Sequence, residues 1–226
     1  MANPVSTYPK LRQDWLKHEN DSKLYRKEVT ILAAAGDLIT GTVMGRISKG
    51  SATSAAKSGG NTGGGTLTID ATTPILAGSK PGVYSVRCIG VVANGGLFEV
   101  RDPDGIPIGN YAIGGAAFAS QIKFAMADSG TDFALGDGFD ITIAAGSGKW
   151  KKHVNGAVNG TEVAAGILLD ARDVSGGADV KGVVVTGNAE IVSAELTWDS
   201  SVDDAPKKAA ALAQLATLGI QTRRLA

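Results

Sequence analysis

Glycine most constrains what this chain can fold into, because it occurs 31 times in 226 positions without a collagen-like period. Glycine destabilises the interior of helices and strands but permits the backbone conformations of tight turns and bulges. Here it is interspersed with many Val, Ile and Thr residues, which favour strands. We therefore expect many short strands joined by tight turns, and a mainly β fold.

The charges of the chain balance, with 22 Lys and Arg residues against 22 Asp and Glu residues. A chain of zero net charge has no long-range field to attract nucleic acid or an anionic membrane. No apolar stretch approaches the roughly 18–20 residues needed to cross a bilayer. The first residues lack the basic start and apolar core of a signal peptide. We expect a soluble protein that is made in the cytoplasm and binds neither nucleic acid nor membranes.

Residues 1–28 form a polar segment in which both signs of charge are densely mixed. Its apolar residues follow neither the period of a strand nor that of a helix. These residues are Tyr8, Leu11, Trp15, Leu16, Leu24 and Tyr25. A segment without a continuous apolar face is expected to be flexible by itself. Because large aromatic residues are typical binding anchors, we interpret 1–28 as an arm that becomes ordered on a partner; a disordered leader is the alternative.

The next two segments differ in amino-acid composition. Residues 29–48 are apolar and β-branched and predict two short core strands, with Gly36 and Asp37 as the turn. Residues 49–146 open with a Ser-, Gly- and Ala-rich tract at 51–65, which predicts a flexible linker. A second Gly/Ser joint closes the segment at 146–148. Two such joints around a β pattern suggest that 49–146 is an inserted domain.

The inserted segment contains strands in which apolar and polar residues alternate. We expect these strands at 83–89, 97–101, 121–127 and 139–143. The residues expected to point inward are Tyr84, Val86, Cys88, Phe98, Val100, Ile122, Phe124, Met126, Phe139, Ile141 and Ile143. An Asp-Pro-Asp-Gly turn at 102–105 suits a tight reversal. This pattern predicts a small antiparallel β-sandwich.

Residues 147–226 predict further short strands and then one helix. The strands are expected at 149–154, 163–169, 180–186 and 189–196. Asp203 or Asp204 can cap the helix, with Pro206 in its first turn. Leu212, Leu215 and Leu218 repeat along one face, and Gly219 and Ile220 suit the end. The fold class is therefore mainly β with one C-terminal helix.

A catalytic or metal-binding arrangement is not evident in the sequence. The two histidines, His18 and His153, are interpreted as surface residues, and paired Cys/His spacing for zinc is impossible with one cysteine. We expect Cys88 to be a small buried apolar residue. Calcium is the alternative for the acidic residues of the insert, but we expect their carboxylates to accept hydrogen bonds from the backbone of their own turns. These residues are Asp102, Asp104, Asp128, Asp132, Asp137 and Asp140. We expect no enzyme activity, no metal and no cofactor.

A resemblance is carried by the two ends of the chain. The segments concerned are 31–36 (ILAAAG), 41–47 (GTVMGRI), 148–150 (GKW), 162–169 (EVAAGILL), 183–190 (VVVTGNAE), 194–198 (AELTW) and 218–220 (LGI). In their order and spacing they resemble the lambda-type bacteriophage head decoration family. The resemblance covers about 1–48 and 147–226. In shorter members the opening strands run almost directly into the Gly-Lys-aromatic stretch, so the intervening residues here fit an insertion.

The resemblance implies a β-rich decoration core (29–48 and 147–226) interrupted by the sandwich-like insert. It also implies a place on the outer surface of the phage head, with the major capsid protein and further copies of this chain, as a homotrimer, for partners. The arm would then reach neighbouring capsid subunits, with Tyr8, Leu11, Trp15, Leu16 and Tyr25 as candidate contacts. Trp198 is a candidate trimer contact, with a place in the core of the domain as its alternative.

Two other functions remain open from the sequence. In the first, the insert faces outward and recognises a host surface or glycan, with Tyr111 and Phe118 as candidate loop-tip aromatics. In the second, the protein is a component of the tail tube or baseplate. The location of the protein on virus particles would separate these alternatives.

Overall fold

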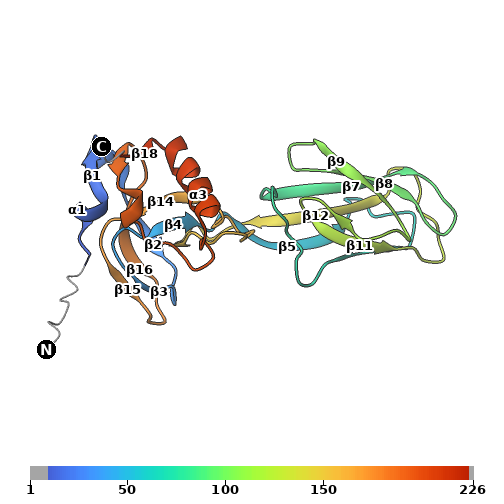
Figure 1. The fold of residues 1–226 in the computed structure, drawn as a ribbon. Helices are drawn as coiled ribbons and strands as arrows, with labels where there is room; N and C mark the ends of the chain where they lie inside the picture. Colours follow the sequence, from blue (N-terminus) through green and yellow to red (C-terminus); the bar gives the residue numbers. More distant parts are fainter. Residues whose placement is uncertain (1–9, 224–226) are drawn as a thin grey trace, which may run out of the picture. The chain divides into compact units, whose positions relative to one another are not determined.

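The computed structural model describes residues 10–223 (Figure 1). The chain divides into two compact units. The first comprises the residues up to Ile47 and from Gly148 onward, and the second comprises Ser48–Ser147. No helix in residues 10–223 is long and apolar enough to span a bilayer.

The first unit is built around a closed barrel with the strand order β13-β2-β16-β14-β4. A three-stranded sheet, β1-β17-β18, and a two-stranded ribbon, β15-β3, complete its β structure. The strands are β1 (Leu16–Glu19), β2 (Arg26–Ile31), β3 (Gly36–Leu38), β4 (Val43–Arg46), β13 (Trp150–Lys152), β14 (Ala164–Leu168), β15 (Arg172–Val174), β16 (Val180–Val185), β17 (Ala189–Ile191) and β18 (Ile220–Thr222). The helical segments are α1 (Arg12–Trp15), α2 (Ser22–Tyr25), the 3-10 turn η1 (Ser193–Glu195) and α3 (Ala205–Thr217).

Closure of the barrel depends on strands that precede and follow the second unit in the sequence. β4 precedes the second unit and β13 follows it, and the two pair antiparallel, with Gly45 opposite Lys151. β13 also pairs in parallel with β2, where Trp150 lies opposite Ile31. The barrel therefore requires strands that are about a hundred residues apart in the chain to become neighbours.

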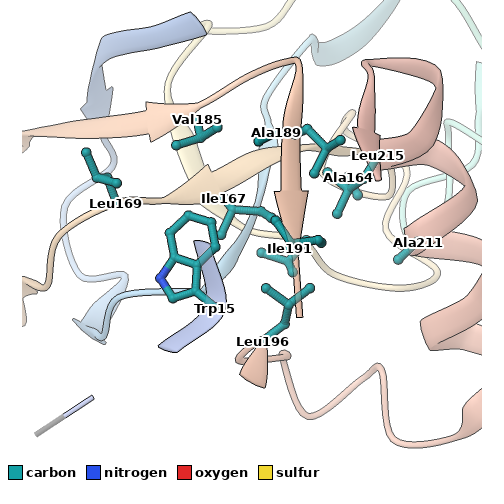
Figure 2. Close-up of a cluster of buried hydrophobic side chains, with 12 residues drawn as sticks. Trp15, Ala164, Ile167, Leu169, Val185, Ala189, Ile191, Leu196, Ala211 and Leu215 are labelled. Carbon is teal, nitrogen blue, oxygen red and sulfur yellow. The ribbon is translucent and has the colours of Figure 1, made fainter. Parts of the chain in front are cut away.

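Two clusters of buried apolar side chains form the core of the first unit. One lies among the barrel strands and the ribbon and includes Ile31, Met44, Trp150 and Leu168. The other joins β14, β17 and α3 and is shown in Figure 2. Glycine allows the strands to approach closely: a Cβ at position 166 of β14 would lie 2.6 Å from the carbonyl oxygen of Val185.

Helix α3 begins and ends where the sequence predicts. The carboxylate of Asp204 accepts a hydrogen bond of 2.8 Å from the backbone N–H of Lys207, and Pro206 lies in the first turn. Gly219 follows the helix with φ +79°. The buried residues of the helix are Ala211 and Leu215, whereas Leu218 is partly exposed.

The second unit contains a five-stranded sheet, β5-β12-β7-β8-β9, and a three-stranded sheet, β10-β11-β6 (Figure 1). Its strands are β5 (Lys49–Ala56), β6 (Thr66–Ile69), β7 (Gly82–Gly90), β8 (Leu97–Arg101), β9 (Pro107–Ala112), β10 (Phe118–Ala119), β11 (Lys123–Ala127) and β12 (Gly138–Ala145). All pairings between these strands are antiparallel. The inward-pointing residues predicted for the four strands are all buried.

Aromatic residues fill the interior of the second unit. The ring of Phe98 meets that of Phe133 edge-on at 5.1 Å, and Phe133 meets Phe139 at 6.1 Å. Phe118 stacks on Phe124 at 5.1 Å. Such contacts contribute beyond simple burial of apolar surface. The fold is mainly β, and α3 is the only helix longer than one turn among residues 10–223, which confirms the predicted fold class.

Two local predictions were wrong. The tract at 51–65 is not a flexible linker over its whole length, because residues up to Ala56 form β5 and pair with the edge of β12. Alternating Ser, Thr and Ala residues can satisfy a ladder even though they lack a strong apolar signal. The turn expected at Gly36 and Asp37 lies earlier, where Ala34 has φ +57°, and Gly36 begins β3.

Candidate interaction surface

The indole of Trp15 anchors the N-terminal segment in the core of the first unit. Its side chain is fully buried and lies beside Ile167, Ile191 and Leu196 (Figure 2). Its Nε1 donates a hydrogen bond of 2.9 Å to Oγ1 of Thr40, whose hydroxyl donates in turn to a backbone carbonyl at 2.6 Å. The Trp15 side chain therefore joins the N-terminal segment to the first unit through a hydrogen bond as well as through apolar contacts.

The chain makes room for this indole with glycine. Gly41 has φ +80°, and a Cβ at this position would lie 3.0 Å from Cδ1 of Trp15. The backbone carbonyl of Trp15 accepts a hydrogen bond of 2.8 Å from the N–H of Val192, just beyond β17. β1 then continues along β17, with Leu16 opposite Ile191. The segment from α1 to β1 is thus part of the folded unit.

Leu11 is held at the surface by the short helix that follows it. Its backbone N–H donates to the carboxylate of Asp14 at 2.8 Å, and its carbonyl accepts from the Asp14 N–H at 3.1 Å. The side chain remains 50% exposed. It borders a hollow of about 320 Å³, which is lined by Lys10, Leu11, Arg12, Gln13, Thr40, Leu169, Asp170 and Ala171. Leu11 is therefore an apolar side chain in a fixed position beside a concave surface.

A second exposed leucine follows in α2. The Asp21 carboxylate caps this helix by accepting from the backbone N–H groups of Lys23, at 2.9 Å, and Leu24, at 3.3 Å. The side chain of Leu24 is 61% exposed. Tyr25, by contrast, is half-buried, and its ring would meet a Cβ at Gly187 at 2.7 Å.

The predicted arm residues therefore fall into different environments. Tyr8 lies outside the described residues, Leu11 is exposed, and Leu16 and Tyr25 are partly buried. Trp15 corrects the expectation that 1–28 lacks a core of its own, because its indole fills a site made by residues far along the chain. Sequence periodicity cannot detect contacts between residues that are so far apart in the chain. Leu24 appeared in the sequence among the apolar residues of the arm but was not selected as a candidate contact.

Charges of both signs surround these leucines. The guanidinium of Arg26 binds the largely buried carboxylate of Glu19 at 2.7 Å, and Lys10 lies 3.9 Å from Glu195. A further hollow, of about 370 Å³, is lined by Asp14, Lys17, Val192 and Glu195. Such a mixed surface suits contacts set by shape and local pairing rather than by a strong field.

Trp198 lies at a second concave surface of the first unit. It is partly buried and packs against the same core cluster as Trp15. It also lines a hollow of about 340 Å³ together with Ser193, Ala194, Leu196, Lys208 and Leu212. One part of the indole therefore supports the core, while another part remains accessible beside α3.

The side chains of His153 and Cys88 are both buried in the fold. His153 is buried, contrary to the surface position expected, and its Nδ1 lies 2.9 Å from the Thr161 carbonyl oxygen. Burial lowers the pKa of this imidazole, and the hydrogen bond with Thr161 only partly opposes that shift. Cys88 is buried as predicted, and burial raises the pKa of its thiol.

Two buried carboxylates of the second unit accept hydrogen bonds from backbone N–H groups of nearby turns and loops. Burial alone would raise the pKa of Asp102, but hydrogen bonds from the Ile106 backbone and the Lys80 ammonium outweigh it and lower that pKa. The Asp137 carboxylate likewise accepts from backbone N–H groups, including Gly63 at 2.9 Å. In the described part of the chain, no group of three or more His, Cys, Asp or Glu residues is placed to hold a metal ion.

The loop tips of the insert are aliphatic rather than aromatic. Tyr111 and Phe118, the candidate tip aromatics, are both buried in the sandwich. Apolar residues are instead exposed in the turn between β7 and β8 and at the adjoining ends of these strands. A neighbouring turn, in which the Gly136 N–H donates to the Cys88 carbonyl oxygen, exposes another. The exposed residues are Ile89, Val91, Val92, Leu97 and Leu135. Alternation in the expected strands already pointed Ile89 and Leu97 away from the interior. Val91, Val92 and Leu135 lie outside the strands, where no alternation assigns them to the interior.

The first unit is a β-barrel with exposed apolar side chains beside shallow hollows, and such features suit a binding surface. The family model for bacteriophage lambda head decoration protein D matches residues 5–220. The chain belongs to this family, which confirms the resemblance found in the sequence. The family is one of structural capsid decoration proteins and is not an enzyme family, so membership supports association with the phage capsid and a place in the virion.

Comparison with curated proteins finds no match. Among solved structures, two crystal forms of FlgL from Xanthomonas campestris are similar to this chain, at 25% and 26% identity over 50% of its length and with a TM-score of 0.30 in each case. The chain spans about a third of those structures, 34% and 33%. At this TM-score the likeness supports no conclusion about fold or function.

Proposed function

We propose that this protein binds the outer surface of the expanded phage capsid and stabilises it against the pressure of packaged DNA. The observation that carries the proposal is the N-terminal segment of a decoration-family chain, which is anchored to the first unit by buried Trp15 and exposes Leu11 and Leu24. The backbone N–H groups of these two leucines are hydrogen-bonded to nearby carboxylates. A ligand that binds only the mature lattice stabilises that lattice by mass action. The protein would be made in the host cytoplasm and added to the assembled head.

In this proposal the parts of the chain have separate roles. Residues 1–28 provide the capsid contact, with Tyr8, Leu11 and Leu24 as proposed direct contacts. Trp15, Leu16 and Tyr25 hold the segment on the first unit. Residues 29–48 and 147–226 form the decoration core, and 49–146 form the insert. Fixed positions lower the ordering cost of binding, since less of the segment must lose conformational freedom on the capsid.

We further propose that copies meet as trimers at the local threefold sites of the shell, through the hollow beside Trp198. A partly exposed indole next to a concave surface is a suitable anchor for such a contact. Three linked contacts bind a lattice far more tightly than one, because each later contact forms at a high effective concentration. A particle reconstruction that shows isolated monomers, or density away from threefold sites, would contradict this part of the proposal.

The capsid contact can be tested with matched leucine variants. Leu11→Asp and Leu24→Asp place charge on the proposed contact, whereas Leu135→Asp places the same charge on an exposed leucine of the insert. Binding to expanded, DNA-free shells of the parent phage is measured by co-sedimentation. We expect roughly tenfold weaker binding for each of the first two variants, and no change for Leu135→Asp. Equal binding by all three would refute the assignment.

Removal of residues 2–9 tests Tyr8 separately, because this deletion leaves Trp15 in place. We expect a folded protein that binds the shells less tightly. A truncated protein that decorates shells with unchanged affinity would exclude Tyr8 from the contact. Labelling of the protein on intact particles distinguishes a head location from the tail-tube or baseplate alternative.

A second role, contact with a host surface, is favoured by the aliphatic residues at the loop tips of the insert. Exposed apolar clusters on soluble proteins often mark interaction sites. The double variant Val91→Ser with Val92→Ser should reduce adsorption of phage to host cells without changing the amount of protein on the heads. Unchanged adsorption would remove the support for this role.

A further inference from the structure

The two edges of the five-stranded sheet in the second unit are built differently. At one edge, β9 begins at Pro107, which has no N–H to donate. Gly109 in the same strand has φ +145°, and the register with β8 shifts between Val100 and Arg101. Proline, irregular backbone and a bulge are devices that prevent another strand from pairing with a sheet edge. The β9 edge is therefore blocked.

The opposite edge, β5, has none of these devices along its regular part. It pairs with β12 on one side only. The irregularity in its register lies near its start, opposite Ile143 and Ala145, so the ladder is regular from Ala52 to Ala56. No residue between Gly50 and Ala56 is charged or a proline. Over these residues the edge is open.

The direction of the main-chain groups follows from one hydrogen bond. The backbone N–H of Lys57 donates to the Gly138 carbonyl oxygen at 3.0 Å, so the N–H of residue 57 points toward β12. Because these groups alternate along an antiparallel strand, those of Ala52, Ser54 and Ala56 point away from β12. Within residues 10–223, no backbone hydrogen bond beyond the β12 ladder is made by these three residues.

We propose that this open edge binds the β5 strand of a second copy of the chain, antiparallel and centred on Ser54. In this alignment Ser54 lies opposite Ser54 of the second copy, and Ala52 lies opposite Ala56. Thr53 lies opposite Ala55. Each outward-pointing N–H then meets an outward-pointing carbonyl, and the two five-stranded sheets become continuous.

A second copy fits this edge better than a charged or bulky partner. The outward-pointing residues are placed symmetrically about Ser54, so one strand is complementary to its own reverse. Since the strand carries no charge from residue 50 to residue 56, pairing with itself brings no like charges together. An edge contact of this length buries less than the roughly 800 Å² per partner of a stable complex. The pairing is therefore weak in dilute solution and forms where copies are held close together.

Cysteine trapping tests both the partner and the register in the full chain. Ser54→Cys places two thiols in a hydrogen-bonded pair, where Cα atoms are about 5.5 Å apart, within the range that a disulfide spans. Thr53→Cys is the matched control, because its opposite residue is Ala55 rather than itself. Native Cys88 is buried and does not compete. Each purified variant is oxidised at high protein concentration and analysed on a non-reducing gel.

We expect covalent dimers from Ser54→Cys alone and from a mixture of Thr53→Cys with Ala55→Cys. Thr53→Cys alone and Ala55→Cys alone should remain monomeric on the gel. Equal dimer yields from Ser54→Cys and Thr53→Cys would indicate random collision and overturn the proposal, as would the absence of any Ser54→Cys dimer.

A second variant tests the contact without oxidation. Ser54→Lys leaves the β12 ladder intact but places two ammonium groups opposite each other in the proposed pair. We expect the sedimentation coefficient of the wild-type chain to rise with concentration more steeply than that of Ser54→Lys. Identical concentration dependence in the two proteins would count against pairing through β5.

Discussion

Replacement of Trp15 by alanine distinguishes a folded N-terminal segment from a flexible arm. The indole is fully exposed in an unfolded chain and fully buried here, so its loss removes a large apolar side chain and leaves a cavity. Substitutions of this kind cost about 3–5 kcal/mol. The lost hydrogen bond adds little, because the hydroxyl of Thr40 still donates to the carbonyl of Leu169. Trp15→Phe keeps most of the apolar contact and should cost less.

All three tryptophans lie in the first unit, so tryptophan fluorescence during urea denaturation follows that unit alone. Leu24→Ala is the matched control, since it changes an exposed residue of the same segment and should stay within about 0.5 kcal/mol of the wild type. A Trp15→Ala protein whose free energy of unfolding equals that of the control would refute the reasoning. The indole would then lie outside the core, as the sequence alone suggested.

Three further outcomes are expected. Burial lowers the pKa of His153 below its ordinary value of 6.5, so the unfolded chain binds the proton more readily than the folded chain. The first unit should therefore lose stability as the pH falls from about 6.5 through the pKa of the folded state. The urea midpoint of His153→Gln should depend less on pH over that range. The thiol of Cys88 should react with a thiol reagent only after unfolding, and rapid reaction of the native protein would contradict its burial. Replacement of 49–146 by a short Gly/Ser link should leave the first unit cooperatively folded, because the free energy of folding changes slowly with loop length. Tryptophan fluorescence measures this. Loss of soluble protein would show that the two units depend on each other.

Much of the fold was predictable because it rests on local signals. Strict alternation placed Tyr84, Val86 and Phe98 inside the sandwich, and the Asp204 cap with Gly219 gave the limits of α3. These features depend on residues a few positions apart. Strand periods and cap chemistry describe such neighbours well.

The errors involve partners that are distant in the chain. Trp15 is buried by residues more than 140 positions later, and β5 becomes a strand because β12 offers it a ladder. His153 is an exception, because its hydrogen-bond partner Thr161 is close in sequence but lies in a loop with no recognisable motif. The candidate contact residues share this difficulty, since the hollow beside Leu11 is lined by Leu169 and Asp170, which are distant in the chain.

The pairing of β4 with β13 has a consequence for the order of events during synthesis. These strands become neighbours only after about a hundred residues have been translated between them, and closing a free loop of that length costs about 4 kcal/mol in chain entropy. If the intervening residues have already collapsed into their sandwich, its ends lie at fixed positions and most of that cost disappears. We therefore expect the nascent chain to complete the insert first and to close the barrel last, as the residues after Gly148 leave the ribosome.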